Sequence, residues 1–93
     1  MPVTFRIPSY LAIFAGGNNL LPVGGSSATV ADALTELWKL HPGLRDRIVD
    51  EQGHVRQHIN IFVGEEAIRF ADGLSTKVPE GAEILIVPAV SGG

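Results

Sequence analysis

One amphipathic helix, set between two groups of short apolar segments, constrains the fold of this 93-residue chain more than any other feature. Its apolar side chains recur at the three- and four-residue spacing of a single helical face. They are Val30, Ala33, Leu34, Leu37 and Trp38. Thr29, with Asp32 three residues later, resembles a helix N-cap with an acidic first turn. Pro42 and Gly43 then end the helix, whose apolar face is predicted to join the core.

Two strands are predicted before this helix. Residues 3–7 alternate apolar and polar side chains, as a strand with one buried face does, and residues 11–14 are expected to extend that strand beyond Pro8. Residues 20–23 form the second strand. The glycines and asparagines at residues 16–19 tolerate a positive φ angle and predict the turn of a hairpin.

Three more strands are predicted after the helix. They lie at residues 59–63, 67–70 and 83–87, the first two forming a hairpin and Pro88 closing the last. Residues 44–49 are expected to form a short helical turn. Residues 71–82 contain two glycines and a proline and are predicted to be a loop.

The order of these elements predicts an α+β domain of the ubiquitin-like β-grasp type. A helix that connects two hairpins packs on one face of a mixed sheet, here of four to five strands with one main helix. The chain has no internal repeat and no linker that would divide it. We assign residues 1–88 to this domain and residues 89–93 to a flexible C-terminal tail.

Composition excludes several classes of function. The chain has no cysteine, so it can form neither a disulfide nor a thiolate, and any sulfur chemistry needs sulfur from outside. Its net charge of −3, without clusters of Lys and Arg, argues against nucleic-acid binding. No apolar run approaches the ~20 residues of a membrane span, and no secretory leader is recognisable. We therefore expect a cytoplasmic protein that is monomeric when free.

No self-contained active site is predicted. His54 and His58 are four residues apart, but they fall on a loop and a strand start rather than on a helix, and His41 is distant from both. No metal site is expected from them. The glycine-rich residues 24–27 precede a helix and are read as its cap, because no nucleotide-binding motif surrounds them. No catalytic residue is assigned, and the chain is predicted not to be an enzyme.

Two aromatic residues are candidates for a partner interface. Phe62 alternates out of phase with Ile59, Ile61 and Val63, so it is expected on the opposite sheet face. Phe70 follows in the next predicted strand. An exposed aromatic side chain on a sheet suits a protein interface, although either residue could instead belong to the core.

The end of the chain, where Gly92 and Gly93 follow the last predicted strand, carries the strongest functional signal. Glycine has no side chain to shield its carbonyl carbon, and a Gly-Gly backbone can enter a cleft that excludes any Cβ atom. Within a partner's active site, ATP could convert the carboxylate of Gly93 to an acyl-adenylate. A sulfur donor could then displace AMP and leave a thiocarboxylate.

The chain resembles the small ubiquitin-like sulfur carriers. This family includes the small subunit of molybdopterin synthase, the thiamine sulfur carrier and the thiocarboxylate carrier of cysteine biosynthesis. The resemblance is densest in the last third of the chain, at residues 60–63, 66, 68–70, 72–74, 79–81, 83 and 86–93. Residues 69–74 are most similar to the carriers of cysteine biosynthesis. Gly64 departs from the asparagine of many relatives, but both residues accept a positive φ angle in a turn.

The resemblance implies a set of roles for the C-terminal residues. Gly93 would be adenylated and thiocarboxylated, while Ala89, Val90, Ser91 and Gly92 would enter the partner's cleft. The chain itself would bind no cofactor, since the ATP is used by the activating enzyme. The implied partners are a ubiquitin-activating-type adenylyltransferase, a sulfur donor, a sulfur-accepting synthase that uses pyridoxal phosphate, and a metal-dependent peptidase.

Three alternatives remain open at this point. The chain could be the small subunit of molybdopterin synthase, whose tail stays inserted in a larger subunit. It could be a ubiquitin-like modifier conjugated to lysines through Gly93. It could also be a plain β-grasp interaction domain, in which case the terminal Gly-Gly would have no role.

Overall fold

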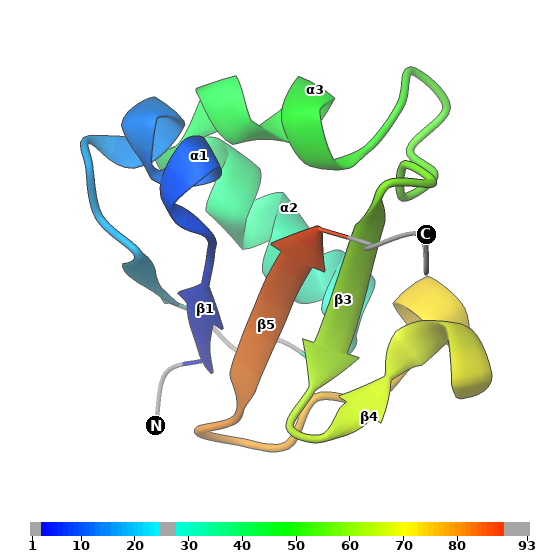
Figure 1. The fold of residues 1–93 in the computed structure, drawn as a ribbon. Helices are drawn as coiled ribbons and strands as arrows, with labels where there is room; N and C mark the ends of the chain where they lie inside the picture. Colours follow the sequence, from blue (N-terminus) through cyan, green and yellow to red (C-terminus); the bar gives the residue numbers. More distant parts are fainter. Residues whose placement is uncertain (1–2, 25–27, 89–93) are drawn as a thin grey trace.

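A computed structural model describes residues 3–24 and 28–88 as one mixed sheet with helices packed against it. The sheet has five strands in the order β2-β1-β5-β3-β4 (Figure 1). β1 and β5 run parallel, and the other neighbouring strands are antiparallel. The strands are β1 (Val3–Arg6), β2 (Leu20–Val23), β3 (Ile59–Val63), β4 (Glu66–Ala67) and β5 (Glu83–Pro88). The predicted succession of two strands, the main helix and three strands along the chain is confirmed, and so is the mixed sheet.

The main helix, α2 (Val30–Leu40), crosses one face of the sheet (Figure 1). It begins with a reciprocal capping box, in which the backbone N–H of Asp32 donates to Thr29 Oγ1 and the backbone N–H of Thr29 donates to Asp32 Oδ2, both at 3.2 Å. Pro42 opens the 3₁₀ helix η2 (Pro42–Leu44) directly after it. The predicted cap and helix end are both confirmed.

The core lies between α2 and the sheet. The apolar stripe of the helix meets the inward-facing side chains of the strands, and the largest fully buried residues come from both layers. Burying each such side chain stabilises the fold by roughly 1.5–3 kcal/mol. These residues include Phe5, Leu37, Ile84 and Ile86. Trp38, predicted to be in the core, is half-buried and packs against its edge.

The predicted extension of the first strand beyond Pro8 is wrong. Residues 9–15 form the short helix α1 (Ser9–Ala12) and the 3₁₀ helix η1 (Ile13–Ala15) instead. Proline has no N–H to continue a strand ladder, and the carbonyl of Pro8 accepts hydrogen bonds from Leu11 N at 3.0 Å and Ala12 N at 3.1 Å. The helical turn then buries Leu11 and Ala12.

The second hairpin is shorter than predicted. β4 ends at Ala67, and the residues expected to complete the strand form the 3₁₀ helix η3 (Ile68–Phe70). A further 3₁₀ helix, η4 (Gly73–Ser75), lies within the predicted loop. The chain leaves the sheet here because it must bury Ile68 and then reach the amino end of α2, where Val30 N donates to Thr76 O at 3.0 Å.

Two other expectations for the middle of the chain are confirmed. The predicted helical turn after α2 is the helix α3 (Arg45–Ile48), which buries Ile48. Gly64, in the turn between β3 and β4, has a φ angle of +62°. A positive φ angle favours glycine or asparagine, so the residue suits its turn.

Candidate functional site

The strand that leads to the C-terminal tail lies at the centre of the sheet. β5 is flanked by β1 on one side and by β3 on the other, and Pro88 at its end is opposite Ile59 (Figure 1). Ile84 and Ile86 are fully buried and fix the strand in the core. The predicted site residues Ala89, Val90, Ser91, Gly92 and Gly93 lie outside the described residues.

An ion pair links β1 to the start of β5. Arg6 Nε donates to Glu83 Oε1 at 3.1 Å, and both side chains are about half exposed. Exposed pairs of this kind contribute roughly 0–1 kcal/mol, because water screens the charges. The position of β5 therefore depends on its buried isoleucines rather than on this pair.

The sheet face away from α2 carries half-buried apolar side chains beside β5. Leu85 and Val87 alternate with the buried isoleucines, so they lie on this face. Phe62 is directly opposite Leu85 in the β3–β5 pairing and is also half-buried. The predicted placement of Phe62, on the face opposite Ile59 and Ile61, agrees with this burial pattern. Its role in a partner interface stays a prediction.

Phe70, the other candidate interface residue, is strongly exposed. It ends η3, and 77% of its surface is accessible to solvent. The guanidinium of Arg69 lies 4.8 Å from the centre of its ring, a cation–π contact. An aromatic side chain this exposed makes little contact with the core, which favours the interface reading over the core reading.

A groove beside β3 was not anticipated from the sequence. Its volume is about 540 Å³, within the size range of ligand-binding clefts. The residues after α3 form one wall and the segment of η3 and η4 forms the other, so neither wall is recognisable from local sequence pattern. The residues that line it include His54, Val55, Arg56, Ala67, Arg69 and Leu74.

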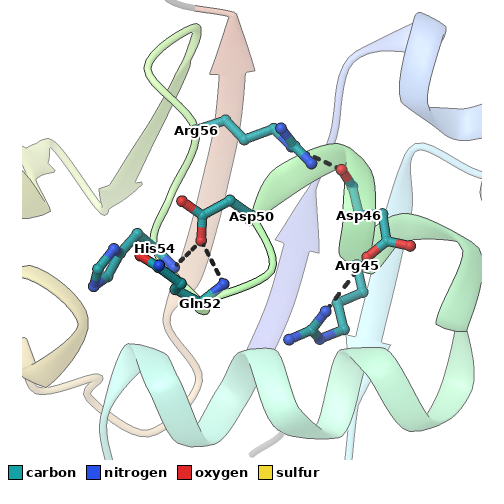
Figure 2. Close-up of polar contacts among 6 residues, drawn as sticks. All are labelled: Arg45, Asp46, Asp50, Gln52, His54 and Arg56. Carbon is teal, nitrogen blue, oxygen red and sulfur yellow. Dashed lines mark hydrogen bonds and ion pairs between the residues drawn. The ribbon is translucent and has the colours of Figure 1, made fainter.

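One wall of the groove is formed by residues 49–58, the loop between α3 and β3, which we call the Asp50 loop because Asp50 organises it. Its Oδ1 accepts hydrogen bonds from the backbone N–H groups of Gln52 and His54, each at 2.9 Å (Figure 2). The bond from His54 is the main reason that the pKa of Asp50 is lowered, because it stabilises the charged carboxylate. Arg56 extends away from this turn, and its Nε donates to the carbonyl of Asp46 at 2.7 Å (Figure 2).

The three histidines lie on different segments of the structure. His41 follows α2, His54 lies in the Asp50 loop and His58 precedes β3. Among residues 3–24 and 28–88, no three His, Cys, Asp or Glu side chains are grouped so that they could hold a metal ion. No helix in the same residues is long and apolar enough to cross a membrane.

Comparison with known proteins places the chain in a family. Residues 10–93 match the ThiS family. The chain belongs to the ThiS family. The sulfur carrier protein CysO of Mycobacterium tuberculosis is 34% identical to this ThiS-family chain over 95 aligned residues, which cover 100% of each protein.

Two further relatives match this ThiS-family chain over most of its length. Small archaeal modifier protein 1 of Haloferax volcanii is 34% identical over 83 residues, covering 89% of this chain and 91% of the relative. A chain in the crystal structure of the Amycolatopsis orientalis BexX/CysO complex superposes with a TM-score of 0.85 and 35% identity. That match covers 98% of this chain and 99% of the other.

These relatives confirm the predicted family and fold. The ThiS-family chain has the ubiquitin-like β-grasp fold of the CysO structures. Its relatives are sulfur carriers and small modifiers rather than enzymes, which confirms that it is not itself an enzyme.

Proposed function

We propose that this ThiS-family protein carries sulfur as a thiocarboxylate on Gly93. The observation that supports this most strongly is its full-length similarity to CysO, a sulfur carrier protein. The fold is consistent with that role, because a central strand anchored by Ile84 and Ile86 gives the residues after Pro88 a rigid base.

The proposed activation has two steps. The Gly93 carboxylate attacks the α-phosphate of ATP in a partner enzyme, which forms the acyl-adenylate and releases pyrophosphate. A donor at the oxidation level of sulfide then attacks the acyl carbon, and AMP leaves with the original carboxylate oxygen. One sulfur has replaced one oxygen, and no net oxidation has occurred. The thiocarboxylate sulfur then attacks an electrophilic carbon of an acceptor, from which a leaving group departs. Hydrolysis of the resulting acyl link to Gly93 releases cysteine or a related sulfur-containing metabolite and restores the carboxylate.

The proposal assigns a physical role to each tail residue. Gly93 leaves its carbonyl carbon open to attack, and Gly92 removes the Cβ atom that would obstruct a narrow cleft. Ala89, Val90 and Ser91 have small side chains and complete the segment that enters the partner. In this proposal the reacting group is on Gly93, five residues along the chain from Pro88, the last residue of β5.

The proposed partners supply everything that the carrier lacks. They are a ubiquitin-activating-type adenylyltransferase that uses ATP, a sulfur donor, an accepting synthase with pyridoxal phosphate, and a metal-dependent peptidase that trims the product. The carrier binds no cofactor in this scheme and is monomeric between encounters. Because these reactions use ATP and reduced sulfur, we place the protein in the cytoplasm.

A second candidate function is conjugation to other proteins through Gly93. The observation that favours it is the 34% identity to small archaeal modifier protein 1. The same acyl-adenylate would serve both functions, because a lysine amine or a sulfur nucleophile can displace AMP. The two functions therefore differ in the acceptor and not in the activation.

Intact-protein mass spectrometry of the chain from its own host tests the proposal. We expect the mass change of one sulfur replacing one oxygen, located at Gly93, and its loss in a Gly93→Val variant that keeps the circular dichroism spectrum of the wild type. Detection of lysine conjugates without the sulfur-containing form would instead support the modifier. Detection of neither, after incubation with ATP, the host activating enzyme and sulfide, would refute activation at Gly93.

A further inference from the structure

We propose that the groove beside β3 docks an extended acidic segment of a partner protein. The groove lies at the sheet edge where β4 ends, between the Asp50 loop and the segment of η3 and η4. In Figure 1 the loop leads into the start of β3, and the yellow η3–η4 segment lies beside that strand. Its volume of about 540 Å³ accommodates several residues of an extended chain. The inference is independent of the chemistry proposed at Gly93, so it holds whether the protein donates sulfur or modifies other proteins.

The lining of the groove is mainly apolar. Val55, Ala67 and Leu74 are half-buried and form its accessible surface, while Ile59 and Ile68 lie beneath them in the core. Apolar surface that stays accessible in the free protein gains stabilisation when a partner covers it, at roughly 25 cal/mol per Å². The groove therefore favours an occupant with apolar side chains.

The charge of the groove favours an acidic occupant. Among the described residues that line it, the ionisable side chains are His54, Arg56 and Arg69, with no Asp or Glu, although the whole chain has a net charge of −3. The Asp50 carboxylate lies close to His54 and Arg56, and Arg56 Nε already donates to the Asp46 carbonyl, so Arg69 is the cationic group that faces a partner. Arg69 has no carboxylate partner in the described part of the chain, where ion pairs engage Arg6, Lys39 and Arg45 instead. An unpaired guanidinium at the rim of an apolar groove is complementary to a carboxylate.

The exposed ring of Phe70 favours a protein over a small molecule. It lies beside Arg69, outside the groove, with 77% of its surface accessible. Aromatic and arginine side chains contribute most to binding at protein interfaces, where they are covered by the partner. A partner segment in the groove would cover Arg69 and extend over Phe70, whereas a small molecule confined to the groove would leave the ring exposed.

The wall formed by the Asp50 loop is already ordered. Val49 pairs with Val55 in an isolated β-bridge, and Arg56 N donates to Ile48 O at 3.0 Å. The two hydrogen bonds to Asp50 fix the turn between these residues. A preformed wall reduces the conformational entropy that binding would cost, so a short segment can bind measurably.

Amide chemical shifts of the full chain test the inference. The probes are an acetylated, amidated hexapeptide of alternating leucine and glutamate and its counterpart with lysine in place of glutamate. We expect only the glutamate peptide to shift the amides of Val55, Ala67, Arg69 and Leu74. Arg69→Glu should weaken that binding by about tenfold, because it replaces attraction with repulsion.

Lys39→Glu is the matched control. It makes the same change of charge at an exposed position on α2, away from the groove, and should leave the affinity unchanged. Equal shifts with the lysine peptide, shifts confined to other surfaces, or an equal loss of affinity in the Lys39 variant would each overturn the proposal. Binding that appears only after residues 89–93 are deleted would also overturn it, because the chain's own tail would then occupy the groove.

Discussion

At the scale of single residues, Asp50 shows how one exposed carboxylate can organise a loop. Its Oδ1 accepts the backbone N–H groups of Gln52 and His54, and the charged form is the better acceptor. The pKa of Asp50 is therefore lower in the folded protein than in the unfolded chain. The turn that it closes forms a wall of the groove, so its protonation state bears on binding there.

The stability that Asp50 contributes should depend on pH. Because its folded pKa is lowered, the contribution is complete above the ordinary aspartate pKa of about 3.9 and is lost as pH falls through the folded value. Asp50→Asn should lower the free energy of unfolding near neutral pH and at about pH 5, and the deficit should shrink by about pH 3. Urea unfolding at these pH values measures it. A deficit that is independent of pH, or equal in Glu51→Gln, would contradict this assignment.

At the scale of elements, the amino end of α2 joins two parts of the chain. Thr29 caps the helix through Asp32, and Thr29 also forms a β-bridge with Lys77. Val78 N donates to Ala28 O at 2.9 Å on the same segment. The cap therefore lies at the point where backbone hydrogen bonds join the start of α2 to the connection between η4 and β5.

Removing this cap should destabilise the fold. Thr29→Ala leaves the N–H of Asp32 without its acceptor and should cost about 1 kcal/mol, equivalent to a melting temperature lower by about 4–8 °C. Thr29→Ser keeps the hydroxyl and serves as the control, with a change well below that of the alanine variant. Thermal unfolding followed by circular dichroism distinguishes them. Equal losses in the two variants would show that the methyl group matters rather than the hydrogen bond.

At the scale of the whole molecule, the described core and the proposed site of function occupy different parts of the chain. The buried apolar residues of residues 3–24 and 28–88 extend from Val3 in β1 to Ile86 in β5. Function is proposed at Gly93, beyond the last of them. Stability and function should therefore be separable.

Deleting residues 89–93 should leave the melting temperature within about 2 °C of the wild type while abolishing activation, because every buried residue of the described core is retained. Ile86→Ala is the contrasting variant, since it creates a cavity in the core and should cost roughly 2–5 kcal/mol. Calorimetry measures the stability of both variants, and the mass change at Gly93 measures activation. A large loss of stability on deletion would show that the tail packs on the domain.

Local patterns predicted the parts of this protein in which neighbours along the chain decide the structure. The spacing of Val30, Leu34 and Leu37 predicted α2, and Thr29 with Asp32 predicted its cap, because a helix repeats over a few residues. Alternation predicted that Ile59 and Ile61 of β3 share a buried face from which Phe62 is excluded. The candidate tail residues were identified in the same way, from small residues after the last strand.

Only the tertiary structure decided the features that depend on distant segments. Residues 11–14 are helical because the turn places Leu11 and Ala12 in the core while their N–H groups donate to the Pro8 carbonyl. Residues 68–70 leave the sheet because Ile68 is buried in the core instead. The groove exists because the Asp50 loop and the η3–η4 segment lie on the same side of β3. The sequence by itself determined the helix, the strands and the candidate tail, since these follow from local periodicity and residue chemistry. Packing between remote segments decided where the chain turns and which surfaces stay open, because burial there depends on partners that no local window contains.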